Sequence, residues 1–287
     1  MSASLIAAAE LRRRLGSREL VLLHGTVELP PPRFDGDHIV ASGRAGWLAG
    51  HVPTARHADL VATLSDAAAA TTFHHLSADA TADAFAALGV GDDSDVVLYD
   101  RGDGLWAARL WWLLRWIGKP AAILDGGLQA WIAAGGEVVR GEEPPSQRAV
   151  LTARPRSDVW IEREQVEAIS RGQADGRLVC ALSRAAFAGS APTRYARRGH
   201  IPGSVVLTAR EFVASDGGFV PLEVARALAE ATLPNRAEAI ALYCGGGVSA
   251  TLAAFALERL GYARLSVYDG SLEEWSANPA LALTQNI

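Results

Sequence analysis

The sequence predicts an α/β protein of two tandem domains, each with a mostly parallel β-sheet flanked by helices. The first observation is an internal repeat across the 287 residues, carried by three pairs of similar segments. These are AGHVPTARHADL at 49–60 with RGHIPGSVVLTA at 198–209, VVLYDRGDG at 96–104 with IALYCGGGV at 240–248, and LDGGLQAW at 124–131 with YDGSLEEW at 268–275. A period of roughly 145 residues is far longer than a solenoid unit and therefore indicates two domains.

The second observation is the alternation of short β-rich segments with helical segments in each half. In the first half, strands are expected near 19–25, 95–100 and 121–127, and helices near 81–89, 105–118 and 128–136. In the second half, strands are expected near 177–182, 239–244 and 264–270, and helices near 222–233, 248–261 and 272–278. Apolar strands that alternate with helices are typical of a parallel sheet covered on both faces.

The ends and the middle of the chain complete the domain plan. Residues 1–16 have their charges after the apolar stretch, which predicts an N-capped amphipathic helix and not a secretory signal. The segment 140–158 is charged and contains prolines without an apolar period. We therefore expect an N-terminal domain at 1–140, a linker at 141–157 and a C-terminal domain at 158–287.

Composition narrows the functional classes. The chain is 49% hydrophobic with a net charge of −5, which gives no reason to expect nucleic acid or an anionic membrane as a partner. It contains no apolar run of the roughly 20 residues that span a bilayer. Its two cysteines suit a reducing compartment, so we expect a cytoplasmic protein without a disulfide framework. The histidines show no metal-ligand spacing, and we assign no metal.

Cys244 is the residue that points most directly to chemistry. It ends an expected strand, is followed by Gly245, Gly246 and Gly247, and precedes a helix expected to begin near Val248 or Ser249. Loops at the carboxyl ends of parallel strands face the site crevice. Glycines let consecutive backbone N–H groups point inward as an anion-binding nest, with the positive end of the helix dipole beside it. We therefore expect a thiolate at neutral pH, although a cysteine beside a glycine turn is also common as a purely structural feature.

These motifs, taken in order, resemble the tandem-domain rhodanese family of sulfurtransferases. The resemblance rests on CGGGVSA at 244–250, GHVP at 50–53, GHIPG at 199–203, DGGLQAW at 125–131 and YDGSLEEW at 268–275. It implies two rhodanese-like domains, of which the first is catalytically silent because Asp100 stands at the position of Cys244. It also implies that Cys244 takes a sulfane sulfur from a small donor as a persulfide. The sulfur then passes to cyanide or to a thiol, such as that of a thioredoxin-like protein, with no cofactor.

The resemblance leaves the sulfur donor open between 3-mercaptopyruvate and thiosulfate. The loop has no basic residue and is similar to that of the mercaptopyruvate type, with Gly246 in place of a serine. Of two family arginines that face the substrate carboxylate, Arg194 matches the second, whereas Ala188 stands at the position of the first. Arg197 and Arg198 lie close enough in sequence to compensate, or they form a solvated basic loop. The expected substrate-binding residues are the loop 245–249 with Arg194, Arg197 and His51.

Other residues have competing interpretations. His51 and His200 recur in both GH-[VI]-P turns, which favours a structural hydrogen-bonding role, and His51 is the more suitable of the two to reach the cleft between domains. The tryptophans of the segment 105–116 fall at helical spacing and predict core and interface packing. Arg109 on the same helix could pair with a carboxylate across that interface. Cys180 is expected to pack as a small strand residue, or else to act as a resolving thiol.

Two alternatives to an active sulfurtransferase are a non-catalytic protein with the same fold and a phosphatase. The family's Asp-x-Arg element is replaced by Cys180-Ala181-Leu182, and His24 stands where an aspartate is common. The loss of these charged groups motivates a non-catalytic sulfur carrier or interaction module with the same fold. A cysteine-dependent phosphatase is excluded, because its Cys-x5-Arg loop would place an arginine where this chain has Ala250.

Overall fold

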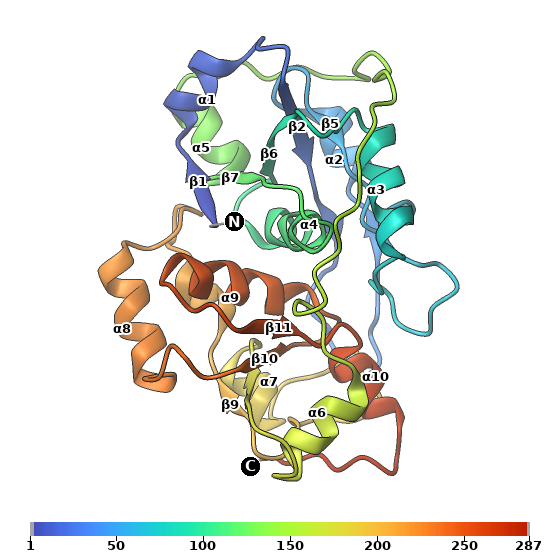
Figure 1. Ribbon diagram of the computed structural model, residues 1–287, viewed down its shortest axis with the longest axis vertical. Coiled ribbons are helices and arrows are strands. Elements are labelled where there is room, and N and C mark those ends of the chain that lie inside the picture. Colours follow the sequence, from blue (N-terminus) through green and yellow to red (C-terminus); the bar gives the residue numbers. More distant parts are fainter. Residues whose placement is uncertain (1–2, 286–287) are drawn as a thin grey trace.

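A computed structural model describes residues 3–285 and shows two α/β units stacked one above the other (Figure 1). The upper unit contains a five-stranded, wholly parallel sheet in the order β1-β7-β6-β2-β5. Its strands are β1 (Ser4–Ile6), β2 (Leu20–His24), β5 (Arg56–His57), β6 (Asp95–Tyr99) and β7 (Ala122–Leu124). Its helices are α1 (Ala8–Arg14), α2 (Arg44–Ala49), α3 (Ala78–Ala87), α4 (Leu105–Trp116) and α5 (Gly127–Ala133). A short antiparallel pair, β3 (Val27–Glu28) and β4 (Ala41–Ser42), lies outside this sheet.

The lower unit repeats this plan with a four-stranded parallel sheet in the order β11-β10-β8-β9. Its strands are β8 (Arg177–Cys180), β9 (Val205–Val206), β10 (Ile240–Tyr243) and β11 (Leu265–Val267). Its helices are α6 (Arg163–Ser170), α7 (Arg184–Ala188), α8 (Leu222–Thr232), α9 (Val248–Arg259), α10 (Ser271–Ala277) and the 3-10 helix η1 (Ala209–Phe212). The two α/β units and their parallel sheets confirm the predicted fold class.

The core explains why these segments are helices and strands. The outer face of each sheet has its own apolar cluster, under α1 and α5 in the first unit and under α6, α7 and α10 in the second. The inner faces share one continuous cluster that includes α4 and α9. All twelve residues of α4 are buried, as its nearly unbroken apolar sequence requires. Its Trp111 meets Phe255 of α9 edge to face at 4.9 Å, which confirms the predicted interface packing.

The N-terminal segment differs from its prediction. Residues 4–6 are not helical but form β1, which pairs in parallel with β7, and α1 begins only at Ala8. The predicted side-chain cap is also absent, because Ala7 at the N-cap position has no side-chain atom that could accept a hydrogen bond from the helix. Met1 and Ser2, which were included in the expected helical segment, lie outside the described residues. A three-residue strand carries too little period to be separated from a helix in sequence.

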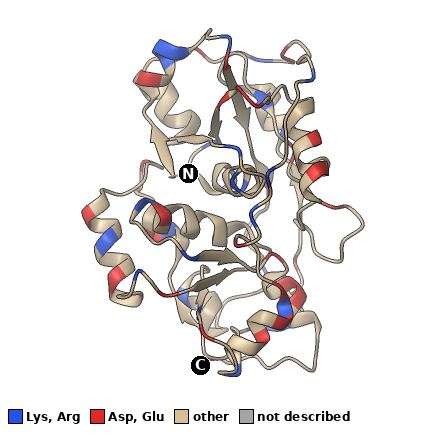
Figure 2. Ribbon diagram, in the orientation of Figure 1, with Lys and Arg blue, Asp and Glu red and all other residues tan. Residues whose placement is uncertain are grey.

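The segment 134–162 contains no helix or strand of its own; it runs along the first unit toward the second, and its end pairs with Val267 of β11 (Figure 1). Ala149 donates its backbone N–H to Ala86, and Arg154 donates to Ile117. In the view of Figure 2, basic and acidic residues are interspersed over both units. None of the helices that the structure describes is long and apolar enough to cross a membrane.

The end of β2 carries a buried polar pair that makes stability depend on pH. His24 is fully buried, with Nδ1 at 3.5 Å from Nδ1 of His57 and Nε2 at 3.1 Å from Oγ1 of Thr26. Burial, reinforced by nearby positive groups, lowers the pKa of His24 to about 3. Below about pH 6.5, His24 therefore binds a proton in the unfolded chain but not in the folded chain. Because the unfolded state binds more protons, the free energy of unfolding decreases as the pH falls below about 6.5.

We expect the variant His24→Asn to lose less stability in acid than the wild-type protein. For one histidine with this pKa, the free energy of unfolding falls by about 2 kcal/mol between pH 6.5 and pH 5. Urea unfolding at both pH values measures the difference, and each protein is compared only with itself at pH 6.5. Equal acid losses in the two proteins would show that His24 is not the responsible group.

Candidate active site

Cys244 lies at the carboxyl end of β10, the strand between β8 and β11. The chain leaves the sheet at this residue and enters α9 at Val248, as predicted. Gly247 has a φ of +75°, and a Cβ at this position would lie 2.5 Å from Oδ1 of Asp269. The turn therefore requires glycine at 247 for two reasons, the backbone conformation and the close approach of a carboxylate.

The loop is held from below by Ser271. Its Oγ accepts hydrogen bonds from the backbone N–H of Cys244 at 3.0 Å and of Gly247 at 3.1 Å, and it donates to the carbonyl of Tyr268 at 2.8 Å. Glu273 adds a backbone bond to the carbonyl of Gly245 at 2.8 Å. The DGSLEEW segment is thus the support of the cysteine loop.

The remaining N–H groups of the loop are available to an anion. Those of Gly245, Gly246, Val248 and Ser249 make no hydrogen bond to any residue in the described part of the chain. The first unit shows what such a loop binds. There, the carboxylate of Asp100 accepts from the N–H groups of Gly102, Gly104, Trp106 and Ala107, at 2.9 to 3.3 Å. The loop of the first unit therefore holds a carboxylate of its own, whereas the N–H groups of the Cys244 loop have no such acceptor among the described residues.

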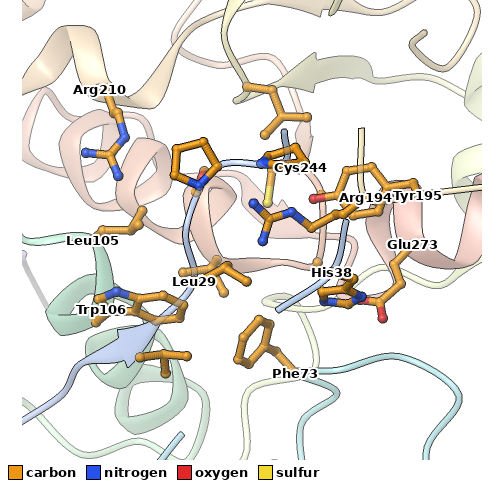
Figure 3. Close-up of a pocket in the computed structure, with 18 residues that line it drawn as sticks. Leu29, His38, Phe73, Leu105, Trp106, Arg194, Tyr195, Arg210, Cys244 and Glu273 are labelled. Carbon is orange, nitrogen blue, oxygen red and sulfur yellow. The ribbon is translucent and has the colours of Figure 1, made fainter. Parts of the chain in front are cut away.

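Cys244 opens onto a cavity of about 280 Å³ between the two units (Figure 3). The sulfur-bearing residue is only 2% exposed. The first unit supplies a mostly apolar wall of Val27, Leu29, Pro31, Pro32, His38, Phe73, Leu105 and Trp106. The second unit supplies Leu182, Arg194, Tyr195, Arg210, Glu273 and four residues of the loop besides Cys244, namely Gly245, Gly246, Val248 and Ser249. The first unit thus forms one side of the cavity, as the family resemblance implies.

Arg194 is the charged group beside the sulfur. Figure 3 shows its guanidinium next to Cys244. Its Nη2 donates to the carbonyl of Pro30 at 3.0 Å, whereas Nη1 is buried with no partner among the described residues. A buried donor without a partner is costly, so this nitrogen has a strong preference for an anionic acceptor in the cavity.

Two of the expected substrate-binding residues, Arg197 and His51, do not line the cavity, contrary to expectation. Arg197 donates to the carbonyls of Trp275, Ser276, Asn278 and Leu281, so its guanidinium closes the end of α10 and does not face the cavity. His51 is fully buried in the first unit, stacked on Trp47 with ring centroids 4.4 Å apart, and its Nδ1 lies 2.8 Å from the Trp47 carbonyl oxygen. Its role is structural. Arg198 is paired with Asp35 at 2.9 Å and also lies outside the cavity.

Cys180 is separated from Cys244 by the sheet. It pairs with Tyr243 in the β8–β10 register and belongs to the outer apolar cluster, whereas Cys244 belongs to the shared inner cluster. Burial raises the pKa of the Cys180 thiol to about 12, so it remains protonated. This environment supports packing and does not favour the role of a resolving thiol.

Arg109 carries the predicted pairing across the interface. It is fully buried on α4, and its Nη1 lies 2.7 Å from Oδ1 of Asp269 in the second unit. Its Nη2 donates to the carbonyl of Phe73, and its guanidinium lies over the ring of Trp160 at 5.2 Å. Burial alone would raise the pKa of Asp269, but the charge of Arg109 holds it below its usual range. Because Asp269 begins the segment that supports the cysteine loop, Arg109 connects the silent unit to the reactive one.

Three residues of the site could not be found by their spacing. Ser271 and Glu273 lie in a repeated motif whose recurrence indicated only structure. Tyr195 follows Arg194 directly, and nothing in sequence shows that its hydroxyl lies against Gly245. A weak signal existed for Glu273, because the corresponding position in the first unit is Gln129, so the motif differs in charge between its two copies.

Comparison with known proteins agrees with this geometry. The rhodanese-like domain family matches residues 8–134 and 189–278 of this chain. The chain belongs to the rhodanese family of sulfurtransferases. It is 34% identical over 284 residues to a Pseudomonas aeruginosa protein named "probable 3-mercaptopyruvate sulfurtransferase", covering 97% of this chain and 96% of the relative.

Two further relatives of this rhodanese-family chain extend the comparison. The mitochondrial thiosulfate/3-mercaptopyruvate sulfurtransferase 1 of Arabidopsis thaliana is 31% identical over 267 residues, covering 81% of this chain and 67% of the relative. The crystal structure of SseA from Escherichia coli, described as a 3-mercaptopyruvate sulfotransferase, has a TM-score of 0.79 at 24% identity and covers 94% of this chain and 99% of that one. At that identity, the likeness to SseA shows the fold alone.

Proposed function

We propose that this chain moves a sulfane sulfur from a small donor, through a persulfide on Cys244, to a thiol or to cyanide. The observation that carries the proposal is the placement of one cysteine beneath unoccupied loop N–H groups and beside the unpartnered Nη1 of Arg194. Backbone donors and a guanidinium stabilise a sulfur anion more than a neutral thiol. The named relatives support the same activity.

The reaction has two half-reactions that restore the enzyme. The Cys244 thiolate attacks the donor sulfur, and a new S–S bond forms. With 3-mercaptopyruvate, the C–S bond breaks and its electron pair leaves as the enolate of pyruvate, which takes up the thiol proton. The acceptor thiolate or cyanide then attacks the outer sulfur, the S–S bond breaks, and Cys244 returns as a thiolate. The unbonded N–H groups of the loop are available to the negative outer sulfur of the loaded state.

We favour 3-mercaptopyruvate, or a similar thiol that carries a carboxylate, over thiosulfate as the donor. Arg194 offers one free guanidinium nitrogen for a carboxylate, and the loop itself carries no basic side chain for a dianion. Gly246 stands in place of the serine of the mercaptopyruvate type. A side chain at this position would meet Glu273, whose Oε2 would lie 3.0 Å from an added Cβ. Thiosulfate is the second candidate, because the Arabidopsis relative is named for both donors.

The test compares cyanide-dependent thiocyanate formation from 3-mercaptopyruvate and from thiosulfate. We expect turnover with each donor, with the higher kcat/KM for 3-mercaptopyruvate. Both activities should depend completely on Cys244. A non-catalytic carrier would accept one sulfur at most and would show no turnover with either donor. A higher kcat/KM for thiosulfate would reverse the order of the donors while the persulfide chemistry stands.

We expect Arg194→Gln to raise the KM for 3-mercaptopyruvate by about tenfold to a hundredfold, the usual effect of losing a hydrogen bond to a charged group. The KM for cyanide should stay unchanged, because that acceptor has no carboxylate. Arg198→Gln is the control, since it removes a guanidinium from the same loop that is paired with Asp35 outside the cavity. Steady-state kinetics with both substrates varied measures the effect. An unchanged mercaptopyruvate KM would remove Arg194 from carboxylate binding.

The acceptor and the compartment belong to the same proposal. A thioredoxin-like protein thiol fits the second half-reaction because a thiolate is the required nucleophile. Both cysteines of the chain are free. A reducing compartment such as the cytoplasm suits this state, because Cys244 must return as a thiol after each cycle.

A further inference from the structure

The hydroxyl of Tyr195 occupies an unusual position against the cysteine loop. A Cβ added to Gly245 would lie 1.4 Å from this oxygen, so only glycine at 245 allows the phenol to approach. The φ of Gly245 is not among the positive values of the chain, and its backbone therefore does not itself require glycine. Figure 3 shows the hydroxyl of Tyr195 pointing toward Cys244 from the rim of the cavity.

This hydroxyl has no hydrogen-bond partner among the residues that the structure describes. In residues 3–285 it makes no hydrogen bond, unlike the hydroxyls of Tyr99, Tyr243, Tyr262 and Tyr268, which are all bonded. It also makes no bond to the Cys244 sulfur. Both residues line the same cavity, so an atom in that cavity can contact both groups. Burial, and then the nearby charge of Cys244, raise the pKa of Tyr195 above its ordinary value, and the phenol therefore keeps its proton as a donor.

A persulfide would extend into this space. Its second sulfur lies about 2 Å beyond the first along the S–S bond. Cys244 lines the cavity, and Figure 3 shows the Tyr195 hydroxyl and the Arg194 guanidinium beside its sulfur. The resting sulfur bonds to neither group, which leaves both for an atom that arrives with the donor.

We propose that Tyr195 is a catalytic residue whose hydroxyl donates a hydrogen bond to the outer sulfur of the Cys244 persulfide. The inference rests on the proposed function and adds to it the group that stabilises the loaded state. The tyrosine keeps its proton throughout, so no bond changes besides those of the sulfur transfer itself. Gly245 then has a second role, because its missing side chain lets the phenol reach the sulfur.

The variant Tyr195→Phe tests this, because it removes the oxygen and keeps the ring. Protein loaded with 3-mercaptopyruvate is titrated with sulfite at fixed thiosulfate, and intact mass gives the fraction of Cys244 that carries the extra sulfur. Sulfite takes the outer sulfur as thiosulfate and leaves the thiolate, so the midpoint reports the stability of the persulfide. Loss of a hydrogen bond to a charged group should lower the sulfite midpoint by about tenfold to a hundredfold.

Two further variants distinguish the loss of this hydrogen bond from a general structural effect of the substitution. Tyr262→Phe is the matched control, since its hydroxyl bonds to the Leu233 carbonyl away from the cavity, and its midpoint should equal that of the wild-type protein. Gly245→Ala displaces the phenol and should shift the midpoint in the same direction as Tyr195→Phe. A Tyr195→Phe midpoint within twofold of wild type overturns the inference and leaves the proposed function intact. A wild-type protein that gains no sulfur from either donor overturns both.

Discussion

Replacing Cys244 by serine will lower sulfur transfer by at least about a thousandfold with every donor, the usual effect of removing a covalent nucleophile. A hydroxyl in this loop is far less ionised than a thiol at neutral pH and forms no persulfide. Thiocyanate formation at saturating donor and cyanide measures the loss. The fold should remain, because Cys244 makes its hydrogen bonds through its backbone, to Ser271 and Leu272.

The chain provides its own control for this experiment. Cys180→Ala removes the other cysteine, which packs on the far side of the sheet and stays protonated. We expect it to retain activity within about threefold, apart from a loss of stability from the small cavity that it creates. Residual activity in Cys244→Ser that disappears in the double variant would instead make Cys180 a nucleophile.

The second large effect is expected at Arg109. Arg109→Met preserves much of the side-chain volume but leaves the carboxylate of Asp269 buried without its guanidinium. Breaking a buried pair in this way costs about 3–5 kcal/mol of folding stability. Activity should fall as well, because Asp269 lies two residues before Ser271, which supports the cysteine loop. Urea unfolding and the kcat with saturating donor measure the two effects.

The double variant Arg109→Met with Asp269→Asn distinguishes an uncompensated charge from a packing defect. It removes both charges together, so we expect it to regain at least half of the lost stability. If Arg109→Met alone costs less than about 1 kcal/mol, the pair is not a determinant of the interface. If it destabilises the protein but leaves kcat unchanged, the interface does not position the cysteine loop.

The repeat and the periodicity were sufficient for the fold. Strands such as β6 and β10 are short apolar runs followed by glycine-containing turns, and α4 and α9 have apolar sequences of helical length, so local pattern and final structure agree. The position of Cys244 could also be predicted, because parallel topology sends the end of each strand to the same edge. The strand β1 was missed because its three residues acquire their conformation only by pairing with β7.

The site residues outside the loop could be predicted only in part, because side-chain direction depends on tertiary contacts. Arg194 and Arg197 are three positions apart in one loop, yet one guanidinium enters the cavity and the other meets the carbonyls at the end of α10. The repeated motif of His51 favoured a structural role, and its ring does stack on Trp47, whereas the expectation that it also reaches the cleft from the first unit was wrong. Tyr195 had no motif at all, and its place in the site is shown only by the structure, where it lines the cavity and its hydroxyl lies against Gly245.

The first unit makes two contributions to this arrangement. It supplies the apolar wall of the cavity, and through Arg109 it holds the segment that supports the reactive loop. Its own loop cannot react, because Asp100 has no sulfur and its carboxylate already occupies the N–H groups. The same backbone architecture therefore binds the side chain of Asp100 in one unit and leaves room for a transferable sulfur in the other.

The central claim is that a sulfur atom is carried on Cys244, and peptide mass mapping tests it most directly. Wild-type protein is incubated with 3-mercaptopyruvate or thiosulfate without an acceptor, digested under non-reducing conditions and analysed. We predict a mass gain of one sulfur atom on the peptide that contains Cys244, lost on addition of cyanide. The absence of any gain with both donors, or a gain confined to the peptide of Cys180, would contradict the claim.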